Sequence, residues 1–113
     1  MKLVGMLPNT ATGRAIGNQI IRSATSVGAN YRAACRSRSK AEFIAKIGTV
    51  AEEADESGFW LELIIEGQLL QPELVNPLHK EAGELTAIFT ASGRTAKANN
   101  SKSTIRNPQS QIF

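Results

Sequence analysis

Arginine residues recur along residues 14–36 at the spacing of one face of a helix. Asparagine, threonine and alanine occupy the other positions of that face, and two more basic residues follow shortly after residue 36. The guanidinium fork suits phosphate groups, and small intervening side chains let a sugar-phosphate backbone approach. The pattern therefore predicts a nucleic-acid-binding surface. The residues assigned to it are Arg14, Arg22, Arg32, Arg36, Arg38 and Lys40.

A second interpretation uses the same arginines for ion pairs. Residues 14–46 carry seven basic residues and one acid, whereas residues 47–84 carry nine acids and one base. The arginines could therefore pair with the acidic cluster at residues 52–56, within one subunit or between subunits. Tyr31 is the only aromatic residue close to the arginines in sequence, so the pattern favours backbone contacts over base recognition. Exposure of the arginine side chains distinguishes the two interpretations.

The acidic cluster at residues 52–56 does not match a metal site. Only Glu52 and Glu56 share a helical face at the i, i+4 spacing, and a di-iron bundle needs Glu-x-x-His pairs on facing helices. The single histidine, His79, has Asn76 three residues before it, so that motif is absent from the sequence. We expect no metal ligands and no cofactor.

Cys35 and His79 are the remaining candidates for a nucleophile and a base. They are 44 positions apart, and a small buried or half-buried thiol is the expected role of the cysteine. We therefore predict no catalytic residue and a protein that is not an enzyme. A rival interpretation, an enzyme whose site forms between subunits, needs convergent titratable groups, of which the chain offers few.

Hydrophobic spacing predicts three long helices. They are expected at about residues 13–36, at about residues 40–66, and from a start between Pro72 and Pro77. Residues 1–7 have the composition of the last turns of another helix. These elements predict an all-α fold, an antiparallel up-down helix bundle of the four-helix type with most of its first helix missing.

Several residues are expected to mark the helix ends. Thr10 or Thr12 can cap the first long helix. Ser37 or Ser39 can cap the second, and Ser39 with Glu42 matches a capping box. Gly67 is expected to end that second helix in the left-handed conformation.

The helix over residues 40–66 carries a heptad-like apolar seam that we expect to form the core. Its members are Phe43, Ile47, Val50, Ala54, Leu61 and Ile64, with Ser57 at the remaining position. The neighbouring faces are Ile16, Ile20, Ala24, Val27, Tyr31 and Ala34, and Leu78, Ala82, Leu85, Phe89, Ser92 and Ala96. The spacing of Gly13 and Gly17 indicates close packing of another segment against the first long helix.

Length and composition fit one domain. The chain has 113 residues, one cysteine and a net charge of +3, and no apolar run long enough to cross a membrane. We expect a cytoplasmic protein, with a helical bundle at residues 1–97. Residues 98–113 turn to Asn, Ser, Lys, Gln and Pro, which predicts a disordered polar tail.

These residues resemble the bacterial four helix bundle protein family, also called the 23S rRNA-intervening sequence protein family, over about residues 2–97. The resemblance is carried by Gly13, Gln19, Ile20, Arg22, Ser23, Ser26, Val27, Ala29, Asn30, Arg38, Ser39, Lys40, Glu42, Phe43 and residues 52–56. It implies a small up-down bundle that assembles as a homo-oligomer, typically a pentamer. One branch of the family contacts RNA and a reverse transcriptase. The family supplies no catalytic residues.

The chain departs from the family at its start. Members usually have a full first helix before the segment that corresponds to residues 2–8, and only its last turn is present here. Three helices and a stub are expected to leave an apolar groove uncovered. The explanations open at this point are a start further upstream, a degraded copy, or a partner that fills the groove. Alone, the chain is expected to be unstable, poorly soluble or oligomeric.

Overall fold

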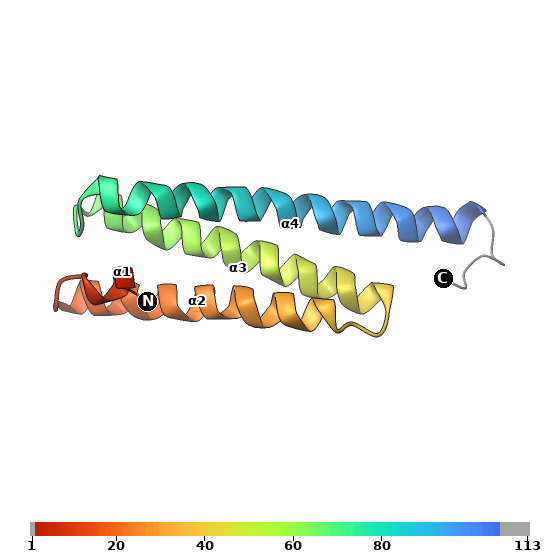
Figure 1. The fold of residues 1–113 in the computed structure, drawn as a ribbon, viewed down its shortest axis with the longest axis horizontal. Helices are drawn as coiled ribbons and strands as arrows, with labels where there is room; N and C mark the ends of the chain where they lie inside the picture. The colour runs from red at the N-terminus through yellow and green to blue at the C-terminus, as the bar shows by residue number, and fades with distance from the viewer. Residues whose placement is uncertain (1, 107–113) are drawn as a thin grey trace.

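A computed structural model describes residues 2–106 of the protein. Within this range the chain forms four helices and no strand, namely α1 (Lys2–Gly5), α2 (Ala11–Cys35), α3 (Lys40–Glu66) and α4 (Pro72–Arg106). The three long helices lie side by side and alternate in direction, with α3 between α2 and α4 (Figure 1). The predicted all-α, antiparallel up-down bundle is confirmed.

Helices α2 and α3 both begin at the predicted polar caps. Thr10 Oγ1 accepts a hydrogen bond from the Gly13 amide at 3.1 Å, and Ser39 Oγ accepts one from the Glu42 amide at 3.1 Å. Each bond satisfies a backbone donor that has no partner inside the helix. The Glu42 carboxylate accepts from the Arg38 amide at 3.5 Å, one residue before the donor that a complete capping box would use.

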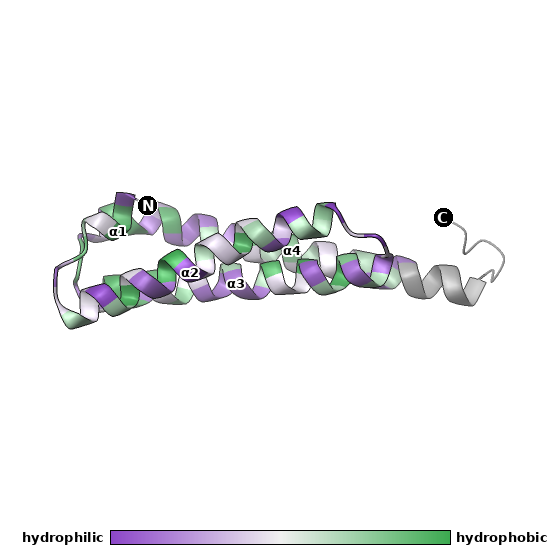
Figure 2. Ribbon diagram, turned by 90° about the horizontal axis from the view of Figure 1, so that it is seen from below, coloured by the Kyte–Doolittle hydropathy of each residue, from purple (hydrophilic) through white to green (hydrophobic). Residues whose placement is uncertain are grey.

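Helix α3 supplies the centre of the core. Its predicted seam is confirmed at five buried positions, while Phe43, in the first turn of the helix, is only half-buried. Figure 2 shows hydrophobic and hydrophilic residues alternating along the long helices, as expected for elements that bury one face. The buried seam residues are Ile47, Val50, Ala54, Leu61 and Ile64.

The apolar faces of α2 and α4 are buried less completely than the seam of α3. On α2, Ile16, Ile20 and Ala34 are buried, but Tyr31 is 48% exposed. On α4, Ala82 and Ala96 are buried. Part of the apolar surface predicted for the core therefore faces solvent.

Helix α4 also buries a residue that the sequence pattern did not mark. Val75 is fully buried, whereas Leu78, one turn further on, is 39% exposed. The helix begins at Pro72, so Val75 lies in its first turn, ahead of Pro77. The apolar face predicted for this helix starts at Leu78, because the sequence leaves the helix start open between Pro72 and Pro77, and it therefore does not include Val75.

The short helix α1 packs against the start of α2. Leu3 is 7% exposed and joins the buried cluster around Ile20 and Leu61. A Cβ atom at Gly13 would lie 2.1 Å from the Pro8 carbonyl oxygen, so only glycine allows this turn to approach α2 so closely. The predicted close-packing role of the glycine pair is thereby confirmed.

The C-terminus of α3 differs from the prediction in one residue. Gly67 has a right-handed conformation, with φ −80°, and Gln68 takes the left-handed one, with φ 55°. The Leu69 amide donates to the Ile64 carbonyl and the Gln68 amide to the Ile65 carbonyl, which is the Schellman arrangement. Packing of Leu69 against the core fixes this register, so the strained position falls on glutamine and not on glycine.

Helix α4 extends further than predicted. It continues to Arg106 without a break at residue 97, so residues 98–106 are helical where a disordered tail was expected. Extending a helix adds one hydrogen bond per residue without a new nucleation step, and neither proline nor glycine interrupts the chain between residues 94 and 107. Residues 107–113 of the predicted tail lie outside the described residues.

Truncating the seam should destabilise the protein strongly. We expect Leu61→Ala to lower the free energy of unfolding by about 2–5 kcal/mol, because it removes buried atoms and leaves a cavity. Phe59→Ala on the same helix is the control, because that side chain is 50% exposed. Urea unfolding followed by circular dichroism measures both. Equal effects of the two substitutions would show that the seam is misassigned.

Glycine at position 68 should stabilise the protein. Gln68→Gly removes a left-handed strain of about 1–2 kcal/mol, offset in part by the greater entropy of glycine in the unfolded chain. The expected net gain is about 0.5–1 kcal/mol. Glu66→Gly, within the regular part of α3, should instead destabilise by a similar amount. A loss of stability in Gln68→Gly would contradict the assigned cap.

Candidate nucleic-acid interface

The predicted basic surface is divided by the structure into separate parts. Its arginines lie along the whole length of α2 and the turn that follows it, and their surroundings differ. Arg14 lies near the start of α2 and Arg22 near its middle, whereas Arg32, Arg36 and Arg38 lie at its C-terminal end.

Arg22 is held by the acids of α3. Its Nη1 atom lies 3.3 Å from Glu53 Oε2, its Nη2 atom pairs with Glu56, and its Nε atom donates to Gln19 Oε1 at 3.2 Å. The hydrogen bond to Glu56 raises the pKa of Arg22 above its ordinary value, and Glu53 adds to this effect. The ion-pair interpretation is therefore correct for Arg22, which joins α2 to α3.

Arg14 is tied to the turn that precedes α2. Its Nη1 atom donates to Asn9 Oδ1 at 2.9 Å. It lies more than four helical turns from Arg32 along α2, so the two cannot contact one short segment of a ligand. The structure does not bring Arg14 into the same site as the arginines at the other end.

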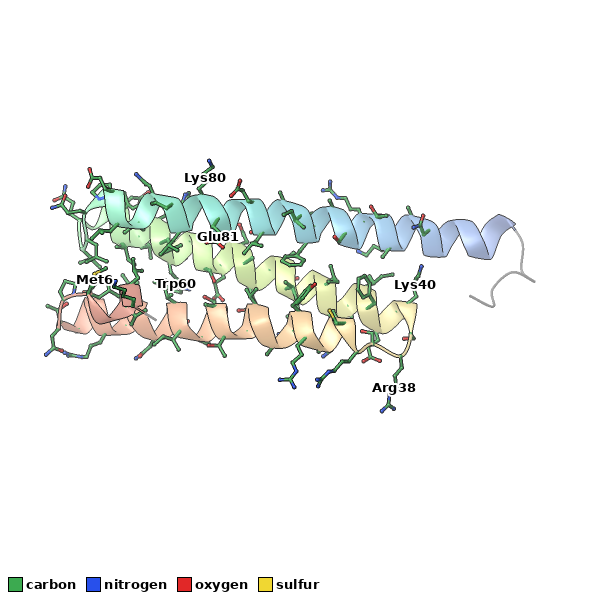
Figure 3. The ribbon with its side chains drawn as sticks, viewed as in Figure 1. Met6, Arg38, Lys40, Trp60, Lys80 and Glu81 are labelled. Atoms are coloured by element: carbon green, nitrogen blue, oxygen red, sulfur yellow. The ribbon has the colours of Figure 1, made fainter. Side chains whose placement is uncertain are left out.

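Arg32, Arg36 and Arg38 line a single surface depression. Ala29, Ala33 and Glu42 complete its wall, and it encloses about 490 Å³. All three arginines are exposed, and none of their guanidinium groups takes part in an ion pair within the described part of the chain. Figure 3 shows Arg38 projecting away from the bundle at the α2–α3 turn. These three residues are called the arginine pocket.

Lys40 belongs to a different surface. It is half-buried at the start of α3 and lines a depression with Phe43 and with Ala91 and Ser92 of α4. The helix turns Lys40 away from the arginine pocket although it is only two residues from Arg38. Of the six residues predicted for the surface, the structure brings three together.

Tyr31 does not line the arginine pocket. Its ring packs against Phe89 of α4, with ring centres 5.6 Å apart and an angle of 56° between the planes. The expectation of a buried or half-buried thiol at Cys35 is wrong, because this residue is exposed on the last turn of α2. The hydrogen bond of Tyr31 with the Cys35 side chain raises the pKa of the Tyr31 phenol. The arginine pocket thus has no aromatic wall on which a base could stack.

Two polar contacts were not predicted. His79 Nε2 lies 2.9 Å from Glu62 Oε1, which links α4 to α3. Ser57 Oγ donates to Ser23 Oγ at 2.8 Å, and Ser23 is fully buried between α2 and α3. The position of Ser57 within the apolar seam was a signal that it needed a partner. Among the residues that the structure describes, no cluster of three His, Cys, Asp or Glu side chains is placed to hold a metal ion.

The fold and these residues match one protein family. Residues 2–91 match the family model described as 23S rRNA-intervening sequence protein. The chain belongs to this family. It is also similar to the crystal structure of a protein of unknown function from the S23 ribosomal protein family of Bacteroides thetaiotaomicron VPI-5482, with 33% sequence identity and a TM-score of 0.66. That similarity covers 70% of this chain and 70% of the other.

No curated protein matches the chain. None of the helices in the described range combines the length and the hydropathy needed to span a membrane. The comparisons therefore assign the family and leave the biochemical role to be inferred from the surfaces of this member.

Removing Arg22 should affect stability in a salt-dependent way. We expect Arg22→Gln to lower the midpoint of thermal unfolding at low salt, because Glu53 and Glu56 lose their partner. The difference should shrink at about 1 M salt, where the screening length is about 3 Å. Arg32→Gln is the matched control and should leave the midpoint unchanged. Equal losses in both variants would contradict the division of the basic surface.

Proposed function

We propose that the protein is a non-enzymatic nucleic-acid-associated protein that binds the phosphate backbone through Arg32, Arg36 and Arg38. The observation that carries this proposal is the arginine pocket itself, with three exposed guanidinium groups around one depression and none used in an ion pair within the described chain. Surface arginines without an ion-pair partner keep their capacity to bind phosphate. The Arg22 guanidinium, in contrast, already binds Glu53 and Glu56 of α3 and Gln19 of α2.

The wall of the pocket favours backbone contacts. Ala29 and Ala33 line the pocket together with the arginines and project no more than a methyl group, so a phosphate can come close to the helix. Arginine binds phosphate in a bidentate manner. Because no aromatic ring lines the pocket, bases have no stacking surface there, and binding should depend little on sequence.

Assembly into a homo-oligomer would strengthen such contacts. A single pocket with three arginines supports only weak binding, but several copies in one assembly would present several pockets to one strand. Linked weak contacts gain affinity from their high effective concentration. The oligomer is part of the proposal and rests on the family to which the chain belongs.

A second candidate function is a protein-protein interaction module. It is favoured by the apolar side chains that remain exposed on α4, such as Leu74 and Ile88, which are 48% and 56% exposed. The two functions use different surfaces and can be tested separately.

The proposal is tested by fluorescence anisotropy with labelled single-stranded RNA, repeated with duplex DNA. Binding should be clear at low salt and should weaken steeply as salt rises, since phosphate contacts release counterions. In the triple variant Arg32→Gln, Arg36→Gln, Arg38→Gln, the slope of log affinity against log salt should flatten by about 2 on single strands, at about 0.7 per lost contact.

The matched control removes the same charge elsewhere. Arg14→Gln, Arg94→Gln, Lys97→Gln lowers the net charge equally at exposed positions outside the pocket. It should keep most of the affinity and the slope. Absence of binding by the unmodified protein at low salt, or an equal loss in the control, would contradict the proposal. Circular dichroism confirms that each variant remains folded.

A further inference from the structure

Glu42 is the one acidic residue in the lining of the arginine pocket. It lies in the first turn of α3 and is exposed, and its amide donates a hydrogen bond to Ser39 Oγ at 3.1 Å. Its carboxylate atom Oε2 accepts from the Arg38 amide at 3.5 Å. The start of α3 and the contact with the turn therefore hold a carboxylate at the edge of the pocket.

The Glu42 carboxylate is not paired with the guanidinium groups that share the pocket. Within the described residues, the ion pairs involve Arg22 and His79, and none of them includes Glu42. The side chains of the pocket thus present two kinds of polar group to a ligand. The guanidinium groups only donate hydrogen bonds, and the carboxylate only accepts them. A phosphate satisfies the first kind and is repelled by the second.

A ligand that carries a hydroxyl group beside its phosphate satisfies both kinds. In RNA the 2′-hydroxyl lies on the ribose carbon next to the carbon that bears the 3′-phosphate, so each bound phosphate brings a donor with it. DNA carries only hydrogen at that carbon. The 2′-hydroxyl is the group by which a protein distinguishes RNA from DNA, and hydrogen bonds to an ionised acceptor are stronger than those between neutral groups.

We propose that Glu42 makes the arginine pocket selective for RNA over DNA. Arg32, Arg36 and Arg38 bind the phosphate, and the Glu42 carboxylate accepts a hydrogen bond from the 2′-hydroxyl of the same nucleotide. With DNA the carboxylate meets no donor on the sugar and only repels the phosphate. This inference rests on the proposed binding of phosphate by the pocket, and it names the nucleic acid that the pocket prefers.

The test must separate the sugar from the base, because amino groups of bases also donate to carboxylates. The probes are therefore three labelled single strands with the same length and the same sequence of adenine and uracil. The first is RNA, and the second is DNA with deoxyuridine. The third is RNA with every 2′-hydroxyl methylated, which keeps the ribose but cannot donate.

Fluorescence anisotropy at low salt compares the three probes. The unmodified protein should bind RNA roughly fivefold more tightly than DNA, which corresponds to the net gain from one hydrogen bond. It should bind the methylated RNA no more tightly than DNA, because the methyl group removes the donor.

Two substitutions separate the hydrogen bond from the repulsion. Glu42→Ala removes both, so the affinity for DNA should rise roughly twofold and the preference for RNA should disappear. Glu42→Gln removes the charge but keeps an acceptor, so the affinity for DNA should rise equally while a preference of roughly twofold remains. Glu52→Gln is the control of equal charge change, because Glu52 is exposed on α3 outside the pocket, and it should keep the full preference. Circular dichroism confirms that each variant is folded.

The outcomes distinguish this inference from the proposed function. Equal affinities for the three probes, with binding lost in the triple variant of Arg32, Arg36 and Arg38, would overturn the role of Glu42 and leave phosphate binding by the pocket in place. A preference for RNA that persists in Glu42→Ala, or methylated RNA that binds as tightly as RNA, would also overturn it. Absence of binding to every probe at low salt would contradict the proposed function and this inference together.

Discussion

Helix α3 is the only long helix that packs along both of the others, and the arrangement of the remaining structure depends on this. Its buried seam faces α2 and α4 together, with Val50 and Ile64 fully enclosed. The backbones of α2 and α4 each pack on α3 and not on each other, and these two helices meet through side chains such as Tyr31 and Phe89, so the three helices form a layer that is open on one side. The apolar depression lined by Ile20 and Val27 of α2 and by Leu78 and Leu85 of α4 follows from the same constraint that forms the core.

The contact between α2 and α3 also decides which arginines remain available. It contains the buried Ser23–Ser57 hydrogen bond, and Ser57 Oγ also lies 3.0 Å from the Glu53 carbonyl oxygen, the alternative acceptor for its single hydroxyl proton. Each hydroxyl also reaches a carbonyl of its own helix, so the pair contributes only the net gain of one hydrogen bond, about 0.5–1.5 kcal/mol, in favour of this register of α2 against α3. In that register Arg22 meets Glu53 and Glu56, whereas Glu42, the acid of α3 that lies beside Arg32 and Arg36, accepts from the Arg38 amide and forms no ion pair with a described residue. The arginine pocket is therefore what remains of the basic surface once packing has used Arg22.

Much of the fold could be predicted from the sequence because its causes are local. Helical periodicity placed the seam of α3, and the side chains of Thr10 and Ser39 placed the helix starts. Local preference for glycine predicts the left-handed conformation at Gly67. Packing of Leu69 against the core places that conformation at Gln68 instead. The burial of Val75 depends on the turn that joins α3 to α4, which periodicity does not describe.

The candidate site was predicted only in part for a related reason. Periodicity shows which residues share a face of α2, but it does not show which neighbouring helix lies beside each turn. Arg22 and Arg36 look alike in the sequence, and the structure separates them because Arg22 forms ion pairs with Glu53 and Glu56 of α3, whereas Arg36 forms none within the described chain. Lys40 follows Arg38 by two residues, and this closeness in sequence predicts one surface for both. The start of α3 instead directs Lys40 toward α4.

The central claim is that α3 divides one basic face into a structural arginine and a binding pocket. Arginine side-chain NMR tests it most directly, by following the Nε–Hε signals while a short single-stranded RNA is added at low salt. The account predicts that the signals of Arg32, Arg36 and Arg38 shift together and that the signal of Arg22 stays in place. A shift of Arg22 equal to theirs, or no shift in those three, would contradict it.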